Sequence, residues 1–71
     1  MEVIEVVLNR PPVELYKILK FENIAASGGE AKHLISEGFV KVNGSVETRK
    51  RKKIVPGDTI EFDRFVLKCM G

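Results

Sequence analysis

The chain has 71 residues, of which 44% are hydrophobic and 31% charged, and a formal net charge of +2. This size predicts one domain over residues 1–71 and leaves no mass for a separate catalytic domain. An acidic start and apolar stretches of at most about three residues argue against a secretory signal and a membrane span. The lone cysteine, Cys69, cannot form an internal disulfide, so we expect a reducing, cytoplasmic location.

Apolar residues partly alternate with polar ones over residues 2–8, which predicts a strand at the edge of a sheet. Asn9-Arg10-Pro11-Pro12 ends this strand. Proline suits the first turn of a helix, because its ring sets the required φ and the missing N–H would be unpaired there. We therefore expect a first helix over about residues 12–21, with an apolar stripe made of Leu15, Ile18 and Leu19.

Ser27-Gly28-Gly29-Glu30 has the spacing of a capping box, in which the serine hydroxyl accepts the backbone N–H of the glutamate. A second helix is predicted over about residues 28–37. Gly38 fits the left-handed position that ends it. The inward residues of this helix are expected to be Ala31, Leu34 and Ile35.

The rest of the chain reads as short strands separated by turns. Asn43-Gly44 predicts a type I′ hairpin turn between strands at 39–42 and 45–48, and Pro56-Gly57 fits the centre of a type II turn. Two further strands are expected at 59–62 and 65–69, with inward residues Ile60, Phe62, Phe65, Leu67 and Cys69. The predicted fold class is α+β: a two-helix unit packed on a small, mostly antiparallel sheet.

Positive charge is concentrated in one segment. Residues 41–53 contain six bases and one acid, a net charge of +5, whereas the remainder contains six bases and nine acids, a net charge of −3. Five adjacent bases at 49–53 must be solvated or paired with an anion, because burying unpaired charges is costly. Phosphates are the natural partner of such a cluster. The alternative is a solvated loop that aids solubility.

Aromatic residues add little to this picture. Phe39 lies two residues before Lys41, so the two side chains would share a strand face, and the ring could stack on a base. The alternative is that Phe39 covers the core. Tyr16 is expected to pack on the surface of the first helix.

The residues from Ser27 to Gly44, read as SGGEAKHLISEGFVKVNG, and then Pro56-Gly57-Asp58-Thr59-Ile60 resemble the S-four RNA-binding domain, also called the alpha-L RNA-binding motif. The pattern covers most of residues 13–62 and is specific because it combines ordered elements at set spacing. It is most similar to small stand-alone bacterial members of that family. The resemblance implies RNA binding through the two helices and the adjoining hairpin.

Two positions depart from the family pattern. Many members carry arginine where this chain has Glu14 and Gly28, so two usual phosphate contacts are missing and Glu14 would repel a phosphate. We therefore shift the expected contacts toward the second helix and the basic run. The expected RNA-binding residues are Ser27, Lys32, Lys41, Arg49, Lys50, Arg51, Lys52 and Lys53.

Candidates for catalysis are weak. One histidine, His33, and one cysteine make no zinc set, and no nucleophile is paired with a base, so we expect no metal, no cofactor and no enzyme activity. The predicted function is a monomeric module that binds structured RNA, such as ribosomal RNA or tRNA, through phosphate contacts. The alternative is an adaptor that docks on an acidic protein surface.

Overall fold

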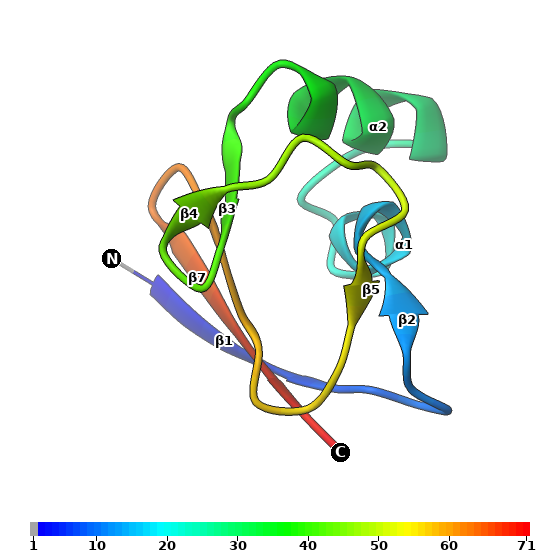
Figure 1. The fold of residues 1–71 in the computed structure, drawn as a ribbon, viewed down its shortest axis with the longest axis vertical. Helices are drawn as coiled ribbons and strands as arrows, with labels where there is room; N and C mark the ends of the chain where they lie inside the picture. The colour runs from blue at the N-terminus through cyan, green and yellow to red at the C-terminus, as the bar shows by residue number, and fades with distance from the viewer. Residues whose placement is uncertain (1) are drawn as a thin grey trace.

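The computed structural model describes residues 2–71. These residues form two helices and seven strands (Figure 1). They are β1 (Glu2–Val7), β2 (Val13–Glu14), α1 (Leu15–Phe21), α2 (Gly28–Ser36), β3 (Val40–Val42), β4 (Ser45–Val46), β5 (Lys53–Ile54), β6 (Thr59–Phe62) and β7 (Phe65–Met70). The α+β fold class is confirmed.

Five of the strands form one sheet in the order β1-β7-β6-β3-β4. β1 pairs with β7 in parallel, and the other neighbours are antiparallel. The prediction that the first strand lies at an edge is therefore confirmed. Both helices lie on the same side of this sheet (Figure 1), and β2 and β5 form a separate two-stranded antiparallel ribbon beside α1.

The predicted start of the first helix was wrong. α1 begins at Leu15, not near Pro12, because Val13 and Glu14 are extended and pair with Ile54 and Lys53 of β5. The proline-based argument considered only local backbone preference. Pairing with a strand roughly forty residues away outweighs it, and the residue that caps the helix is Glu14.

The predicted caps and turns are confirmed. Ser27 Oγ accepts the backbone N–H of Glu30 at 3.2 Å, and α2 ends where Gly38 adopts a φ of 82°. Asn43 and Gly44 have φ angles of 52° and 85°, as a type I′ turn requires. These positions follow from the sequence because each depends on the conformational freedom of one or two residues.

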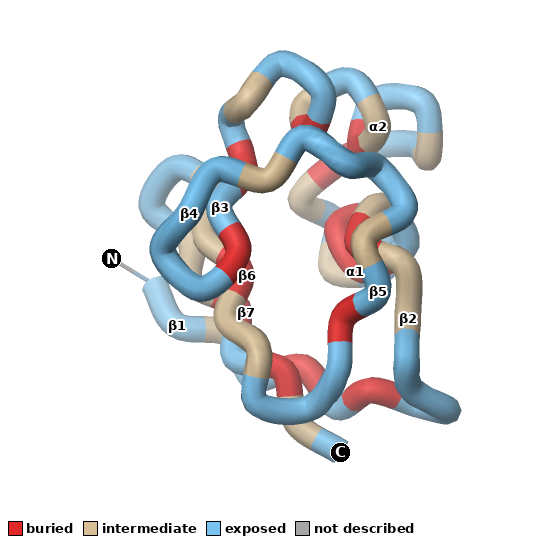
Figure 2. Tube along the Cα trace, in the orientation of Figure 1, coloured by how far each residue is buried: buried red, intermediate tan, exposed pale blue. Residues whose placement is uncertain are grey.

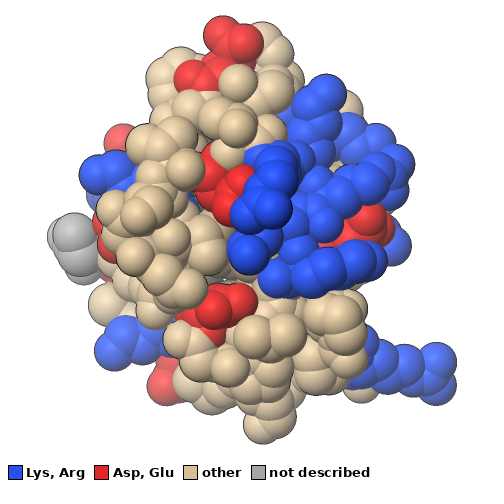
Figure 3. Space-filling model, viewed as in Figure 1, with Lys and Arg blue, Asp and Glu red and all other residues tan. Residues whose placement is uncertain are grey.

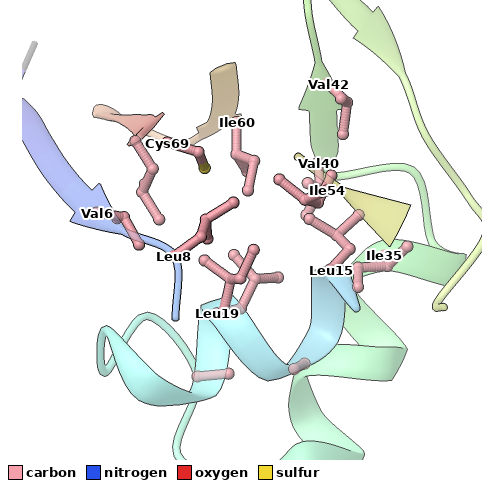
Figure 4. Packing of buried hydrophobic residues seen from close by; sticks show 14 residues of the cluster. Val6, Leu8, Leu15, Leu19, Ile35, Val40, Val42, Ile54, Ile60 and Cys69 are labelled. Atoms are coloured by element: carbon pink, nitrogen blue, oxygen red, sulfur yellow. The ribbon is translucent and has the colours of Figure 1, made fainter. Parts of the chain in front are cut away.

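The core lies between the helices and the five-stranded sheet. Buried segments meet there, whereas the connections β1–β2 and β4–β5 are largely exposed (Figure 2). Leu15 and Leu19 of α1 pack toward Ile60 and Val40 of the sheet (Figure 4). Cys69 is a core residue, as expected, and burial raises the pKa of its thiol to about 11. Within residues 2–71 no charged side chain is buried in this core.

The hairpin turn and the Pro-Gly-Asp turn are tied together. Asn43 Nδ2 donates to one carboxylate oxygen of Asp58 at 3.0 Å, and the backbone N–H of Val55 donates to the other at 3.0 Å. Asn43 Oδ1 in turn accepts the backbone N–H of Thr59 at 2.9 Å. Together these bonds hold the chain that leads from β5 into β6 against the tip of the β3–β4 hairpin. The Val55 N–H, followed by the Asn43 amide, lowers the pKa of Asp58.

We expect Asp58→Asn to cost about 1 kcal/mol at neutral pH, because it weakens hydrogen bonds to an ionised acceptor. The folded-state pKa of Asp58 is depressed, so its contribution is fully present above the unfolded-state value of about 3.9 and is lost as pH falls through the folded value. Urea unfolding across the acid range should therefore show a steeper loss of stability in the natural protein than in the variant. Parallel pH profiles would contradict this role.

Candidate nucleic-acid interface

The basic connection between β4 and β5 is held against the first turn of α1. The backbone N–H of Leu15 donates to the carbonyl oxygen of Lys52 at 2.9 Å, and that of Tyr16 donates to the carbonyl oxygen of Lys50 at 3.3 Å. The first N–H groups of a helix have no partner inside the helix. Here the connection satisfies two of them with its own backbone, so the conformation of the basic run is set by the helix.

Tyr16 lies at the centre of a group of cations. Its ring centroid is 4.7 Å from Lys32 Nζ, 5.4 Å from Arg51 Cζ and 6.0 Å from Lys17 Nζ. These distances are within reach of cation–π attraction, which contributes roughly 0.5–1 kcal/mol at an exposed site. The ring therefore gathers side chains from α1, α2 and the basic connection, which are far apart in the sequence.

Glu14 anchors two of these cations. Arg51 Nη1 donates to Glu14 Oε2 at 3.2 Å, and Lys17 Nζ lies 3.2 Å from Glu14 Oε1. The hydrogen bond from Arg51 lowers the pKa of Glu14 and raises that of the guanidinium. The Glu14 side chain is only 14% exposed, whereas that of Arg51 is 63% exposed. The carboxylate is thus covered by its partners, and the guanidinium remains open to solvent.

A second acid restrains the start of the run. Glu47 accepts from Arg49 Nε at 2.9 Å, from Arg49 Nη2 at 3.2 Å and from the backbone N–H of Arg49 at 3.0 Å. These bonds lower the pKa of Glu47 and raise that of Arg49. An arginine held by two parallel bonds has a set orientation, so Arg49 has less freedom than its lysine neighbours.

The cations of this region form what we call the basic surface, which comprises Lys17, Lys32, Arg49, Lys50, Arg51, Lys52 and Lys53. With Glu14 and Glu47 included, its formal net charge is +5. Figure 3 shows one continuous cationic area over the β4–β5 connection and the adjoining helices, interrupted by few acids. The protein's own carboxylates therefore neutralise only part of the run, and an open cationic face remains.

The expected site residues are not all in one place. Lys32 and Arg51 meet at Tyr16, and Lys50, Lys52 and Lys53 continue the same surface. Lys41 points away from the helices, because Val40 and Val42 on either side of it are buried, and its strand neighbours are Glu61 and Val46. Ser27 is occupied as the cap of α2.

Phe39 neither joins the basic surface nor fills the core. The residue is 59% exposed and borders a hollow whose other lining residues are Leu34, Phe62 and Asp63. The expectation that Phe39 covers the core is therefore wrong, and stacking of this ring on a base stays a prediction. The residues that line this hollow include one acid and no lysine or arginine.

Sequence reasoning missed the roles of Glu14, Tyr16 and Lys17. Glu14 was expected to repel phosphate, but its charge is taken up by Lys17 and Arg51. The i,i+3 spacing of Glu14 and Lys17 was a local signal for one ion pair. Nothing in the sequence pattern signals that Arg51 meets Tyr16, because that contact depends on the β2–β5 pairing.

Comparison with known proteins places the chain in a family. A family model described as the S4 domain matches residues 6–69. The Escherichia coli (strain K12) protein YbcJ is 58% identical over 52 residues, which cover 73% of this chain and 74% of YbcJ. Lysine and arginine clustered on one face are typical of a nucleic-acid-binding module. This chain belongs to the S4 domain family.

Two further comparisons agree with that assignment. The solution structure of E. coli YbcJ, described as revealing an alfaL motif involved in RNA-binding, superimposes with a TM-score of 0.69 at 44% identity. The match covers all of this chain and 89% of that one. The probable ribosome maturation protein RlbA of Bacillus subtilis (strain 168) is 36% identical over 53 residues, 75% of each chain.

Two features are absent from residues 2–71. No group of three or more histidine, cysteine, aspartate or glutamate side chains is placed to hold a metal ion. Neither helix in this part of the chain has the length and apolar character needed to cross a membrane.

The ion pair beneath the basic surface can be tested by titration. In Arg51→Gln, the pKa of Glu14 should rise toward its ordinary value, because the largest cause of its depression is removed. Carboxyl carbon NMR shifts followed against pH measure this directly. Arg49→Gln is the matched control and should raise the pKa of Glu47 while leaving that of Glu14 low. An unchanged Glu14 titration in Arg51→Gln would show that the pair does not form in solution.

Proposed function

We propose that this chain is an RNA-binding module that recognises structured RNA through phosphate contacts and performs no catalysis itself. The single observation that carries the proposal is the basic surface, where seven cations and two acids leave a net charge of +5 on one face. Family membership supports it, since the solved relative YbcJ has a motif described as involved in RNA-binding. Residues 1–71 act as one module, and we propose that it binds as a monomer.

The backbone contacts explain how this surface would work as a preformed site. Lys50 and Lys52 are tethered through their carbonyl oxygens, and Arg51 through Glu14, so the cations are positioned before RNA arrives. Less ordering is then required on binding, which favours affinity. A-form RNA displays phosphates and 2′-hydroxyls more readily than base edges. We infer recognition by backbone and shape, as suits ribosomal RNA or tRNA.

The proposed RNA-binding residues differ in how directly they would contact phosphate. Lys32, Lys50, Arg51, Lys52 and Lys53 face the RNA directly, with Arg49 at the margin because Glu47 holds it. Lys41 and Ser27 make peripheral contacts: Lys41 lies on the outer sheet face, and the oxygen of Ser27 already accepts a hydrogen bond. The ring of Tyr16 acts by positioning Lys32 and Arg51.

Salt dependence tests the mechanism. If about four phosphates are contacted, the logarithm of the association constant for an RNA hairpin should fall with log salt at a slope of roughly −3 to −4. Lys32→Gln combined with Lys50→Gln should reduce the magnitude of the slope by about two. These positions are preferable to Arg51, whose loss would also release Glu14. Fluorescence anisotropy at several salt concentrations gives both values.

The matched control is Arg64→Gln with Lys68→Gln, which removes the same charge from β7 and the turn before it, outside the basic surface. It should leave the slope close to that of the natural protein. A flat salt response in the natural protein, or equal slopes in both double variants, would contradict the proposal. Purification with a protein partner and without nucleic acid would instead favour docking on an acidic protein surface.

A further inference from the structure

Two adjoining hollows lie beside the basic surface, between α1 and the β1–β2 connection. The first, of about 200 Å³, is bordered mainly by apolar side chains, including Val7, Ile18 and Phe21. The second, of about 300 Å³, is bordered by Arg10, Lys17 and Lys53. They share Asn9, Val13 and Phe21, so they form one continuous depression with an apolar half and a cationic half.

Phe21 is the aromatic residue that lines the apolar half. It is the last residue of α1, and 68% of its surface is exposed. The neighbouring Val7 is also exposed, so the hollow offers apolar surface to a ligand rather than closing over its own core. An aromatic ring open to solvent beside a cationic groove is the arrangement on which unpaired bases stack in proteins that bind single strands.

The cationic half continues the basic surface. Lys17 and Lys53 belong to both, and Arg10 adds a third cation from the β1–β2 connection. Figure 3 shows a cationic side chain that projects where this connection lies in Figure 1. The one acid that borders this half, Glu14, is already bound by Lys17 and Arg51. An incoming phosphate would therefore meet three cations, of which Lys17 already pairs with Glu14.

We propose that this depression holds one unpaired nucleotide of the bound RNA, with its base against Phe21 and its phosphate between Arg10, Lys17 and Lys53. This inference deepens the proposed function and rests on it. The preferred RNA would be a paired stem that ends in, or is interrupted by, a single-stranded nucleotide. Asn9 and Glu22 also border the apolar half and offer polar groups to the edge of the base.

The cations that border the depression favour a nucleotide, which carries a phosphate, over an apolar protein segment as its ligand. Phe39 is the other exposed phenylalanine that borders a hollow. Among residues 2–71, the residues that line its hollow include Asp63 but no lysine or arginine. Of the two, only the depression at Phe21 combines an open ring with several cations. Phe39 therefore supplies a matched control: a similarly exposed ring, without the phosphate-binding half.

The test compares two RNAs, a blunt-ended duplex and the same duplex with a short single-stranded extension at either end. The natural protein should bind an extended form roughly ten-fold more tightly, the range that stacking of one base provides. Phe21→Ala should abolish this preference and leave the affinity for the blunt-ended duplex unchanged. Phe39→Ala should retain the preference. Fluorescence anisotropy measures the affinities, and thermal melting followed by circular dichroism confirms that each variant is folded.

A second arm tests the phosphate-binding half. Arg10→Gln should reduce the salt slope by about one for the extended RNA and leave it unchanged for the blunt-ended duplex. Lys68→Gln, the matched control, should change neither slope.

Each contrary outcome has a defined meaning. No preference for the extended RNA, or a preference that survives Phe21→Ala in a folded protein, would overturn this inference while leaving the proposed function intact. Sedimentation showing a dimer that Phe21→Ala disrupts would assign the depression to a second copy of the chain instead. Failure to bind either RNA in a salt-dependent way would overturn the proposed function itself.

Discussion

The basic surface depends on one constraint: five adjacent cations must be held in a defined conformation despite their mutual repulsion. The backbone N–H groups of Leu15 and Tyr16 provide it by binding the carbonyl oxygens of Lys52 and Lys50. The first N–H groups of α1 lack acceptors within the helix, and the carbonyl oxygens of the connection supply them. These two hydrogen bonds hold the backbone of the basic connection in place, and its charged side chains extend from it.

The two departures from the family pattern, Glu14 and Gly28, both lie beside the basic surface. Glu14 stands where arginine is common, yet its carboxylate recruits Arg51 from the basic connection. Gly28 stands where a second arginine is common, and a Cβ there would lie 3.8 Å from Tyr16. A side chain at this position would begin in ordinary van der Waals contact with the ring that Lys32 and Arg51 share. Positive charge thus reaches this face from other elements.

Hydrogen bonds that join Asn43 to Asp58 and to Thr59 support the basic surface. They hold the tip of the β3–β4 hairpin to the turn that follows β5, so both ends of the basic connection are attached to ordered structure. The Asn-Gly and Pro-Gly-Asp signals of the sequence were each sufficient to predict a turn. That the two turns bind each other follows only from their closeness in the folded chain.

The sequence by itself determined the features that depend on local backbone preference: the Ser27 cap, the turns at Gly38, Asn43-Gly44 and Pro56-Gly57, and the alternating inward residues of β6 and β7. Tertiary structure decided the rest. The β2–β5 ribbon, the late start of α1 and the gathering of cations at Tyr16 depend on contacts between residues far apart in the chain. Such contacts leave no periodic pattern in the sequence, because the groups that form them come together only in the folded chain.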